Sequence, residues 1–138
     1  MISWRHTLKR IGEELDLANR KRKALDNLLE AGRISRETYE MFKKEVDEAV
    51  GEVEARKKAL IEEMNRRSHE LEQQLRTLEA FLASSEIRYV TGDVDEETYK
   101  HENEVLTLGI ESTKRELQEI QEAINQLLRV EEAPAPTP

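Results

Sequence analysis

The chain has 138 residues, about the length of one ordinary domain, and a formal net charge of −8 at pH 7. Charged residues make up 38 %, hydrophobic residues 37 % and aromatic residues only 4 %, which favours long solvated helices over a globule with a thick core. The absence of cysteine excludes disulfides, thiolate metal ligands and cysteine nucleophiles. No segment approaches the roughly 18 apolar residues of a membrane span, and the start lacks a signal-peptide pattern. We therefore expect a cytoplasmic protein.

A first helix is predicted over about residues 3–31, because apolar residues from Trp4 to Leu29 recur three and four apart. This region is basic: residues 1–35 carry eight Lys and Arg against five Asp and Glu, a balance of +3 that leaves −11 for the rest. Four cations share the face opposite the apolar stripe: Arg5, Lys9, Arg20 and Lys23. Such a face either binds an anionic surface such as lipid headgroups, or pairs with a neighbouring subunit and solvent. The aromatic residues of a nucleic-acid platform are missing, so nucleic acid is not an expected partner.

Two copies of one turn pattern lie 60 residues apart, as an internal repeat of the form G-x-[IV]-[SD]-x-E-T-Y. In each copy a glycine suits the left-handed end of one helix, and a Ser or Asp suits the N-cap of the next. The tyrosine falls where it can pack on the Ile or Val as a hydrophobic staple. The turn residues are Gly32, Ile34, Ser35 and Tyr39 in the first copy, and Gly92, Val94, Asp95 and Tyr99 in the second. Each copy therefore predicts a helical hairpin, and a tyrosine ligand site is the less favoured interpretation.

The second and third helices are predicted over about residues 35–91 and 95–131. Apolar steps of three and four are sustained along both, which is the signal of a coiled coil. Pairing Leu29 with Tyr39 keeps apolar residues opposite one another along the first hairpin, except that Arg22 faces Val46. The equivalent register pairs Leu78 with Ile110 in the second hairpin. We predict an all-α, elongated antiparallel coiled coil of three helices, whose long central helix carries the first and third helices on its two halves.

Apolar residues outside these stripes include Leu17, Leu28, Ile61, Phe81, Ile87 and Leu108. A two-stranded monomer would leave them in contact with water, so we expect a homodimer or a higher self-assembly. The helices are expected to form one domain over residues 1–132, with the repeated turns at 32–35 and 92–95. The remaining residues, 133–138, are predicted to be a disordered tail, whose Pro134, Pro136 and Pro138 are a candidate docking peptide.

No pattern of catalytic chemistry is found. The five glycines form no phosphate-binding loop, and His101-Glu102-Asn103-Glu104-Val105 has Val105 where a zincin motif needs its second histidine. None of the three histidines follows a glutamate by three residues, as the di-iron bundle signature requires. Paired carboxylates such as Glu13-Glu14 suit a solvated helix face. We therefore expect no catalytic residue, no metal site and no cofactor.

The chain resembles the coiled-coil region of archaeal cell-division protein A. The similar segments are Leu28 to Ser35 with the following Tyr39, Glu70-Leu71-Glu72, Gly92 to Tyr99, Leu106 to Ile110, and Glu116-Leu117, within roughly residues 20–128. The resemblance implies a non-enzymatic scaffold that polymerises at membranes or nucleoid-associated structures and recruits ESCRT-III-like division proteins. We expect this chain to depart from the family in two ways, in having no small β-barrel domain ahead of the coiled coil and no counterpart of the partner-binding strand in Ala133–Pro138.

Two functional hypotheses follow. The first is a structural scaffold, peripheral at the membrane, in archaeal cell division or membrane remodelling. The second is a module that binds anionic membrane or nucleic acid through its basic first helix.

Overall fold

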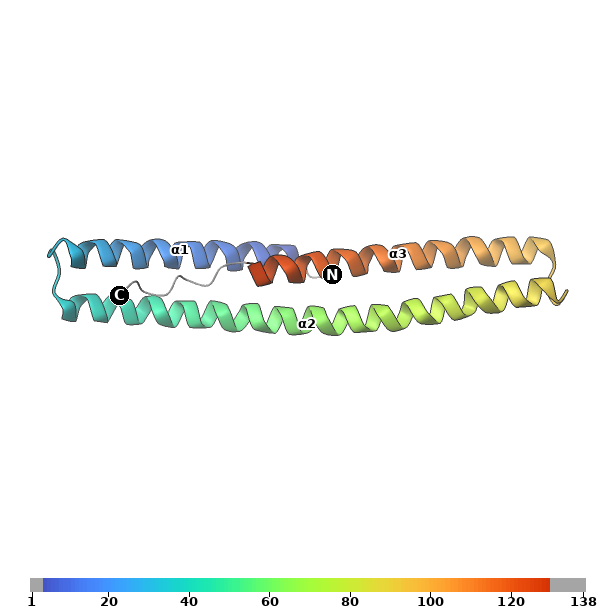
Figure 1. Ribbon diagram of the computed structural model, residues 1–138, viewed down its shortest axis with the longest axis horizontal. Coiled ribbons are helices and arrows are strands. Elements are labelled where there is room, and N and C mark those ends of the chain that lie inside the picture. The colour runs from blue at the N-terminus through green and yellow to red at the C-terminus, as the bar shows by residue number, and fades with distance from the viewer. Residues whose placement is uncertain (1–3, 130–138) are drawn as a thin grey trace. The chain divides into compact units, whose positions relative to one another are not determined.

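A computed structural model describes residues 4–129 of the chain. It contains three helices, α1 (Trp4–Glu30), α2 (Arg36–Val90) and α3 (Glu96–Arg129), and no strand within the described residues (Figure 1). The predicted all-α fold is confirmed, and the boundaries of the three helices inside the described range fall within one residue of their predicted positions. The predicted tail, with Pro134, Pro136 and Pro138, lies outside the described residues.

The described chain divides into two compact units. The first unit contains the residues up to Glu62 and those from Asn125 onward, and the second spans Glu63–Ile124. In the first unit α1 lies antiparallel beside the first half of α2, and in the second unit α3 lies beside the second half of α2 (Figure 1). Each unit is thus built on a helical hairpin, as the repeated turns predict. The single domain expected over residues 1–132 stays a prediction.

The buried residues follow the apolar stripes of the sequence. In the first unit, α1 buries Ile11, Leu15 and Ala18, and α2 buries Tyr39, Val46 and Val53. In the second unit, the buried apolar residues are Met64, Leu71, Ile120 and Ala123. Because these positions recur at steps of three, four or seven residues, each helix buries one narrow stripe and leaves the rest of its surface in water. This narrow core explains how so highly charged a chain folds.

The first turn ends α1 through backbone hydrogen bonds. The amide of Gly32 donates to the carbonyl of Leu29 at 3.0 Å, and the amide of Arg33 donates to Leu28 at 2.9 Å. Gly32 has φ = 70°, the left-handed conformation that this pair of bonds requires. The second turn repeats the arrangement at Gly92, whose φ is 82°. A side chain at either glycine would meet no neighbour within 4 Å, so backbone conformation is the reason for glycine here.

Side-chain caps begin the helices that follow. The amide of Thr38 donates to Ser35 Oγ at 3.1 Å, and the amide of Thr98 donates to Asp95 Oδ1 at 2.8 Å. Hydrogen bonds from the hydroxyl and then the amide of Thr98 hold the pKa of Asp95 below its usual range. The caps satisfy amide donors that the first turn of a helix leaves unpaired.

Candidate functional site

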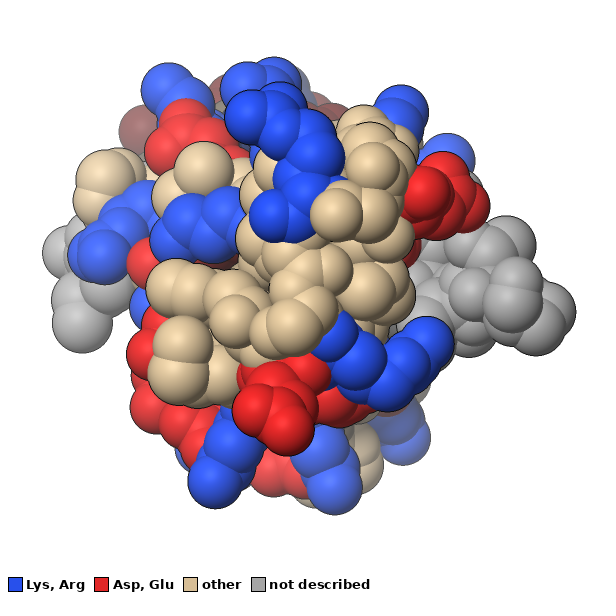
Figure 2. Space-filling model, turned by 90° about the vertical axis from the view of Figure 1, so that its left-hand side faces the viewer, with Lys and Arg blue, Asp and Glu red and all other residues tan. Residues whose placement is uncertain are grey.

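The four cations of the predicted anionic-surface site lie on α1 among carboxylates. Lys9 Nζ is 4.0 Å from Glu13 and Arg20 is 3.1 Å from Asp16, each one helical turn away. The guanidinium of Arg5 lies 5.0 Å from the centre of the Trp4 ring, and Lys23 is exposed. In the view from the end where α1 turns into α2, basic and acidic residues alternate around an uncharged surface (Figure 2). Because Lys9 and Arg20 lie beside acidic residues of their own helix, the cationic face of α1 is mixed in charge.

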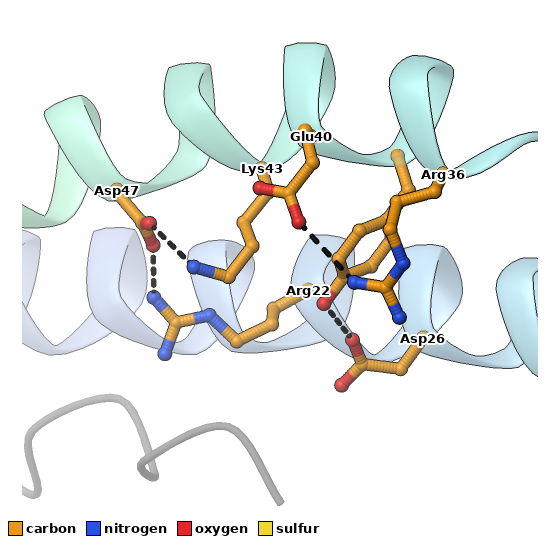
Figure 3. A network of polar contacts seen from close by, with 7 residues as sticks. Arg22, Asp26, Arg36, Glu40, Lys43 and Asp47 are labelled. Carbon is orange, nitrogen blue, oxygen red and sulfur yellow. Dashed lines mark hydrogen bonds and ion pairs between the residues drawn. The ribbon is translucent and has the colours of Figure 1, made fainter. Parts of the chain in front are cut away.

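A polar network crosses the first hairpin (Figure 3). The Arg22 guanidinium reaches across from α1 to Asp47 Oδ1 of α2 at 2.6 Å, and Lys43 donates to the other carboxylate oxygen at 3.0 Å. The Arg22 side chain is only 11 % exposed, against 42 % for Asp47. Burial opposes ionisation of Asp47, but the hydrogen bonds from Lys43 and Arg22 outweigh it, so the pKa of this carboxyl is lowered. The predicted register places Arg22 opposite Val46, and the carboxylate that pairs with Arg22 belongs to the next residue, Asp47.

The turn tyrosines make the same contact in both hairpins. The Tyr39 hydroxyl donates to Asp26 Oδ1 at 2.7 Å, and the Tyr99 hydroxyl donates to Glu86 (Asp26 is labelled in Figure 3). Asp26 and Glu86 are 60 residues apart, like the tyrosines, so the repeat extends into the helix that precedes each turn. The hydrogen bond to the carboxylate, then burial, raises the pKa of Tyr39. Both tyrosines therefore tie the two helices of a hairpin together.

The second hairpin has its own polar cluster. Ser85, which is fully buried, donates its hydroxyl to Glu102 at 2.7 Å, and Arg88 donates to the same carboxylate oxygen at 3.0 Å. Tyr89 and Tyr99 stack with ring centres 4.1 Å apart, which matches the predicted register of this hairpin. These groups hold α2 against α3 at the turn end of the second hairpin.

An open groove of about 570 Å³ runs along the first hairpin. Its floor is formed by Ala18, Leu25, Val46 and Val53, which belong to the core stripe. Its two walls are heptad-spaced, with steps of three and four residues. The α1 wall consists of Glu14, Leu17, Lys21, Ala24 and Leu28, and the α2 wall of Phe42, Glu45, Ala49, Glu52 and Arg56. Leu17 and Phe42 are 52 % and 43 % exposed, so each wall carries a large exposed apolar side chain among charged and small residues.

A smaller groove of about 320 Å³ occupies the matching place on the second hairpin, lined by Phe81, Arg88, His101, Glu102, Val105 and Leu106. Five of these six residues stand 60 positions after a residue that lines the first groove; only His101 does not. The repeat therefore includes the groove as well as the turn. At the matched positions Glu102 and Arg88 take the places of Phe42 and Leu28, whereas Phe81 and Val105 take the places of Lys21 and Glu45. The two grooves therefore differ in where their charged residues lie.

Within residues 4–129, no group of three or more His, Asp or Glu side chains is arranged to hold a metal ion. No helix in that range has an apolar stretch long enough to cross a membrane. The features that the described residues offer for function are therefore surfaces, namely the groove, its charged walls and the mixed face of α1.

Comparison with known proteins agrees with this architecture. Residues 3–137 match the model of the CdvA-like coiled-coil domain. The chain is also 22 % identical over 124 residues to Cell division protein A of Sulfolobus acidocaldarius, an alignment covering 90 % of this chain and 52 % of that protein. The chain thus spans about half the length of this curated relative. No solved structure matches. Because the family match covers nearly every residue, the chain belongs to the CdvA-like coiled-coil domain family.

Proposed function

We propose that the protein is a non-enzymatic coiled-coil scaffold of archaeal cell division. The observation that carries the proposal is the family match over residues 3–137, together with the similarity to Cell division protein A. The fold supports it, because two helical hairpins present long charged surfaces and apolar grooves to other proteins. This function needs no catalytic group.

The finer parts of the proposal concern place and partners. The scaffold works in the cytoplasm, peripheral at the membrane, as a homodimer or larger self-assembly, and it recruits ESCRT-III-like division proteins. We favour it over binding through Arg5, Lys9, Arg20 and Lys23 alone, because two of these cations lie within 4.0 Å of carboxylates on their own helix. Paired surface cations retain less attraction for anionic lipid or nucleic acid than an unpaired cluster does.

The test is localisation in dividing cells. The full chain, tagged with a fluorescent protein, would be expressed in Sulfolobus acidocaldarius, the source of the similar division protein. We expect a band at the division plane, and co-purification of ESCRT-III-like proteins with the tagged chain. A variant with Leu71, fully buried, changed to Asp disrupts the fold and is the matched control. Diffuse fluorescence of the folded chain at every stage of division would contradict the scaffold role.

A further inference from the structure

The groove on the first hairpin has an unusual distribution of charge. Its Arg56 forms an ion pair with Glu14 across the two walls. The other three charged wall residues, Lys21 of α1 and Glu45 and Glu52 of α2, make no ion pair with any residue that the structure describes. Elsewhere on α1, Lys9, Arg10 and Arg20 each lie within 4.0 Å of a carboxylate one turn away. The groove therefore keeps one positive wall residue and two negative ones available for a partner.

The Glu14–Arg56 pair also fixes the register of the two walls. The helices are antiparallel, so moving seven residues forward from Glu14 on α1 corresponds to moving seven residues back from Arg56 on α2. Lys21 therefore lies level with Ala49. A further seven residues put Leu28 level with Phe42. Lys21 thus sits at the middle of the groove, and Glu45 and Glu52 flank Ala49 by about one turn on either side. Ala24 and Ala49 are small, so another helix can approach the groove closely.

From this arrangement we propose that the groove of the first hairpin is the interface with a second copy of the chain. A twofold axis parallel to the helices lays α1 of one copy against α2 of the other. Lys21 of each copy then meets Ala49 of the other, between its Glu45 and Glu52, and Leu28 meets Phe42. The contact is self-complementary in charge and in apolar side chains, as an isologous interface requires.

The alternative twofold axis, perpendicular to the helices, is disfavoured. It lays α1 against α1 and, when it passes through the middle of the groove, sets Lys21 opposite Lys21, which is repulsive. Both axes give a four-helix bundle in which every helix neighbours two helices of opposite direction, so the charges decide between them. Each copy then covers the exposed Leu17 and Phe42 of the other. The inference deepens the proposed scaffold role by naming the surface through which two scaffold chains join.

Charge reversal with a mixing rescue tests the pairing. We expect the wild-type chain to show twice its 16.1 kDa mass by light scattering behind size exclusion. Lys21→Glu alone, or Glu45→Lys with Glu52→Lys, should raise the dimer dissociation constant about tenfold or more. Each variant places like charges against one another at both symmetry-related copies of the contact. An equimolar mixture of the two variants should restore the dimer. Lys23→Glu, on the same helix but outside the groove, is the matched control and should leave the mass unchanged.

Cross-linking tests the same contact in the wild-type chain, without any substitution. A zero-length carbodiimide reagent joins amines to carboxylates, and a mixture of ¹⁵N-labelled and unlabelled chains separates contacts between copies from contacts within one. We expect mixed-isotope peptides that join Lys21 to Glu45 or Glu52.

A wild-type monomer at every concentration would overturn the interface. So would a dimer unaffected by Lys21→Glu, or variants that stay monomeric on mixing. A helix of another division protein in the groove would appear as a monomer that gains mass only when that protein is added. None of these results bears on localisation at the division plane, so failure of the interface and failure of the scaffold role are distinguishable.

Discussion

The Arg22–Asp47 pair gives the sharpest prediction for stability. Arg22 is 11 % exposed and lies opposite an apolar stripe, whereas Asp47 is 42 % exposed and also accepts from Lys43. Asp47→Ala removes the carboxylate that both cations contact, so the two positive groups are left close together. Losing one partner of a charged hydrogen bond costs about 1–3 kcal/mol, and the exposure of Asp47 places this case near about 1 kcal/mol.

Arg22→Met should have the opposite result. Replacing the charge by an apolar side chain of similar length removes the desolvation cost of Arg22 and adds packing against Val46. Such replacements are often neutral or stabilising by about 1 kcal/mol or more. Urea unfolding followed by circular dichroism, at one fixed protein concentration, measures both variants and their combination. The reasoning is refuted if Arg22→Met lowers the free energy of unfolding more than Asp47→Ala does.

The same pair predicts a dependence on pH. Because the pKa of Asp47 is lowered in the folded protein, its contribution is fully present above the pKa of the unfolded chain. The contribution is lost as pH falls through the lowered folded value. Asp47→Ala should therefore differ most from wild type near neutral pH and converge with it in acid. A constant difference down to pH 2 would contradict the assignment.

Two further predictions concern the turns. Gly32→Ala should cost about 1 kcal/mol in urea unfolding, because φ = 70° is unfavourable for alanine. Gly51 lies inside α2 with open space around it, so Gly51→Ala should raise the free energy of unfolding by a similar amount. If both substitutions changed the free energy of unfolding in the same direction, the conformational explanation would be contradicted. Tyr39 has a raised pKa, so its contribution is complete below the unfolded value of tyrosine and is lost as pH rises through the folded value. The pKa of Tyr99 is raised too, by its hydrogen bond to Glu86, so absorbance titration should show Tyr39 and Tyr99 both ionising after free tyrosine. Tyr39→Phe should remove one of these two late-ionising groups.

The fold was predictable from the sequence because its determinants are local. Steps of three and four residues identify the helices, and a glycine followed three residues later by a Ser or Asp identifies each turn. Antiparallel pairing then follows from the short connections. The polar contacts between helices were not predictable in the same way. Asp47 and Glu102 lie beside the apolar stripe, and a pattern built from apolar positions does not show which carboxylate reaches Arg22 or Ser85.

The groove was only partly visible in the sequence. Leu17 and Leu28 stand out as apolar residues beyond the main stripe, which led to the expectation of a dimer. Their alignment with Phe42 and Ala49 appears only when the Glu14–Arg56 pair sets the two helices in register. The heptad spacing of the two walls could not be recognised from the pattern of apolar residues, because charged residues occupy half of the wall positions. The sequence does not show which of these charged residues form ion pairs, and only the structure shows that Glu14 pairs with Arg56 while Lys21, Glu45 and Glu52 pair with no described residue.

The repeat explains why the first hairpin, rather than the second, suits self-association. The two grooves occupy matching positions, but Phe42 of the first corresponds to Glu102 of the second. Glu102 already accepts hydrogen bonds from Ser85 and Arg88, so its charge is satisfied within its own hairpin. In the first hairpin, Arg22 and Asp47 form the polar contact away from the groove, and the phenyl ring of Phe42 stays exposed. Both copies have thus kept the chemistry of the turn, but their grooves differ. The unpaired Lys21 and Glu45 of the first groove correspond to Phe81 and Val105 of the second, so the charge pattern of the proposed contact is found in the first groove and not at the matched positions of the second.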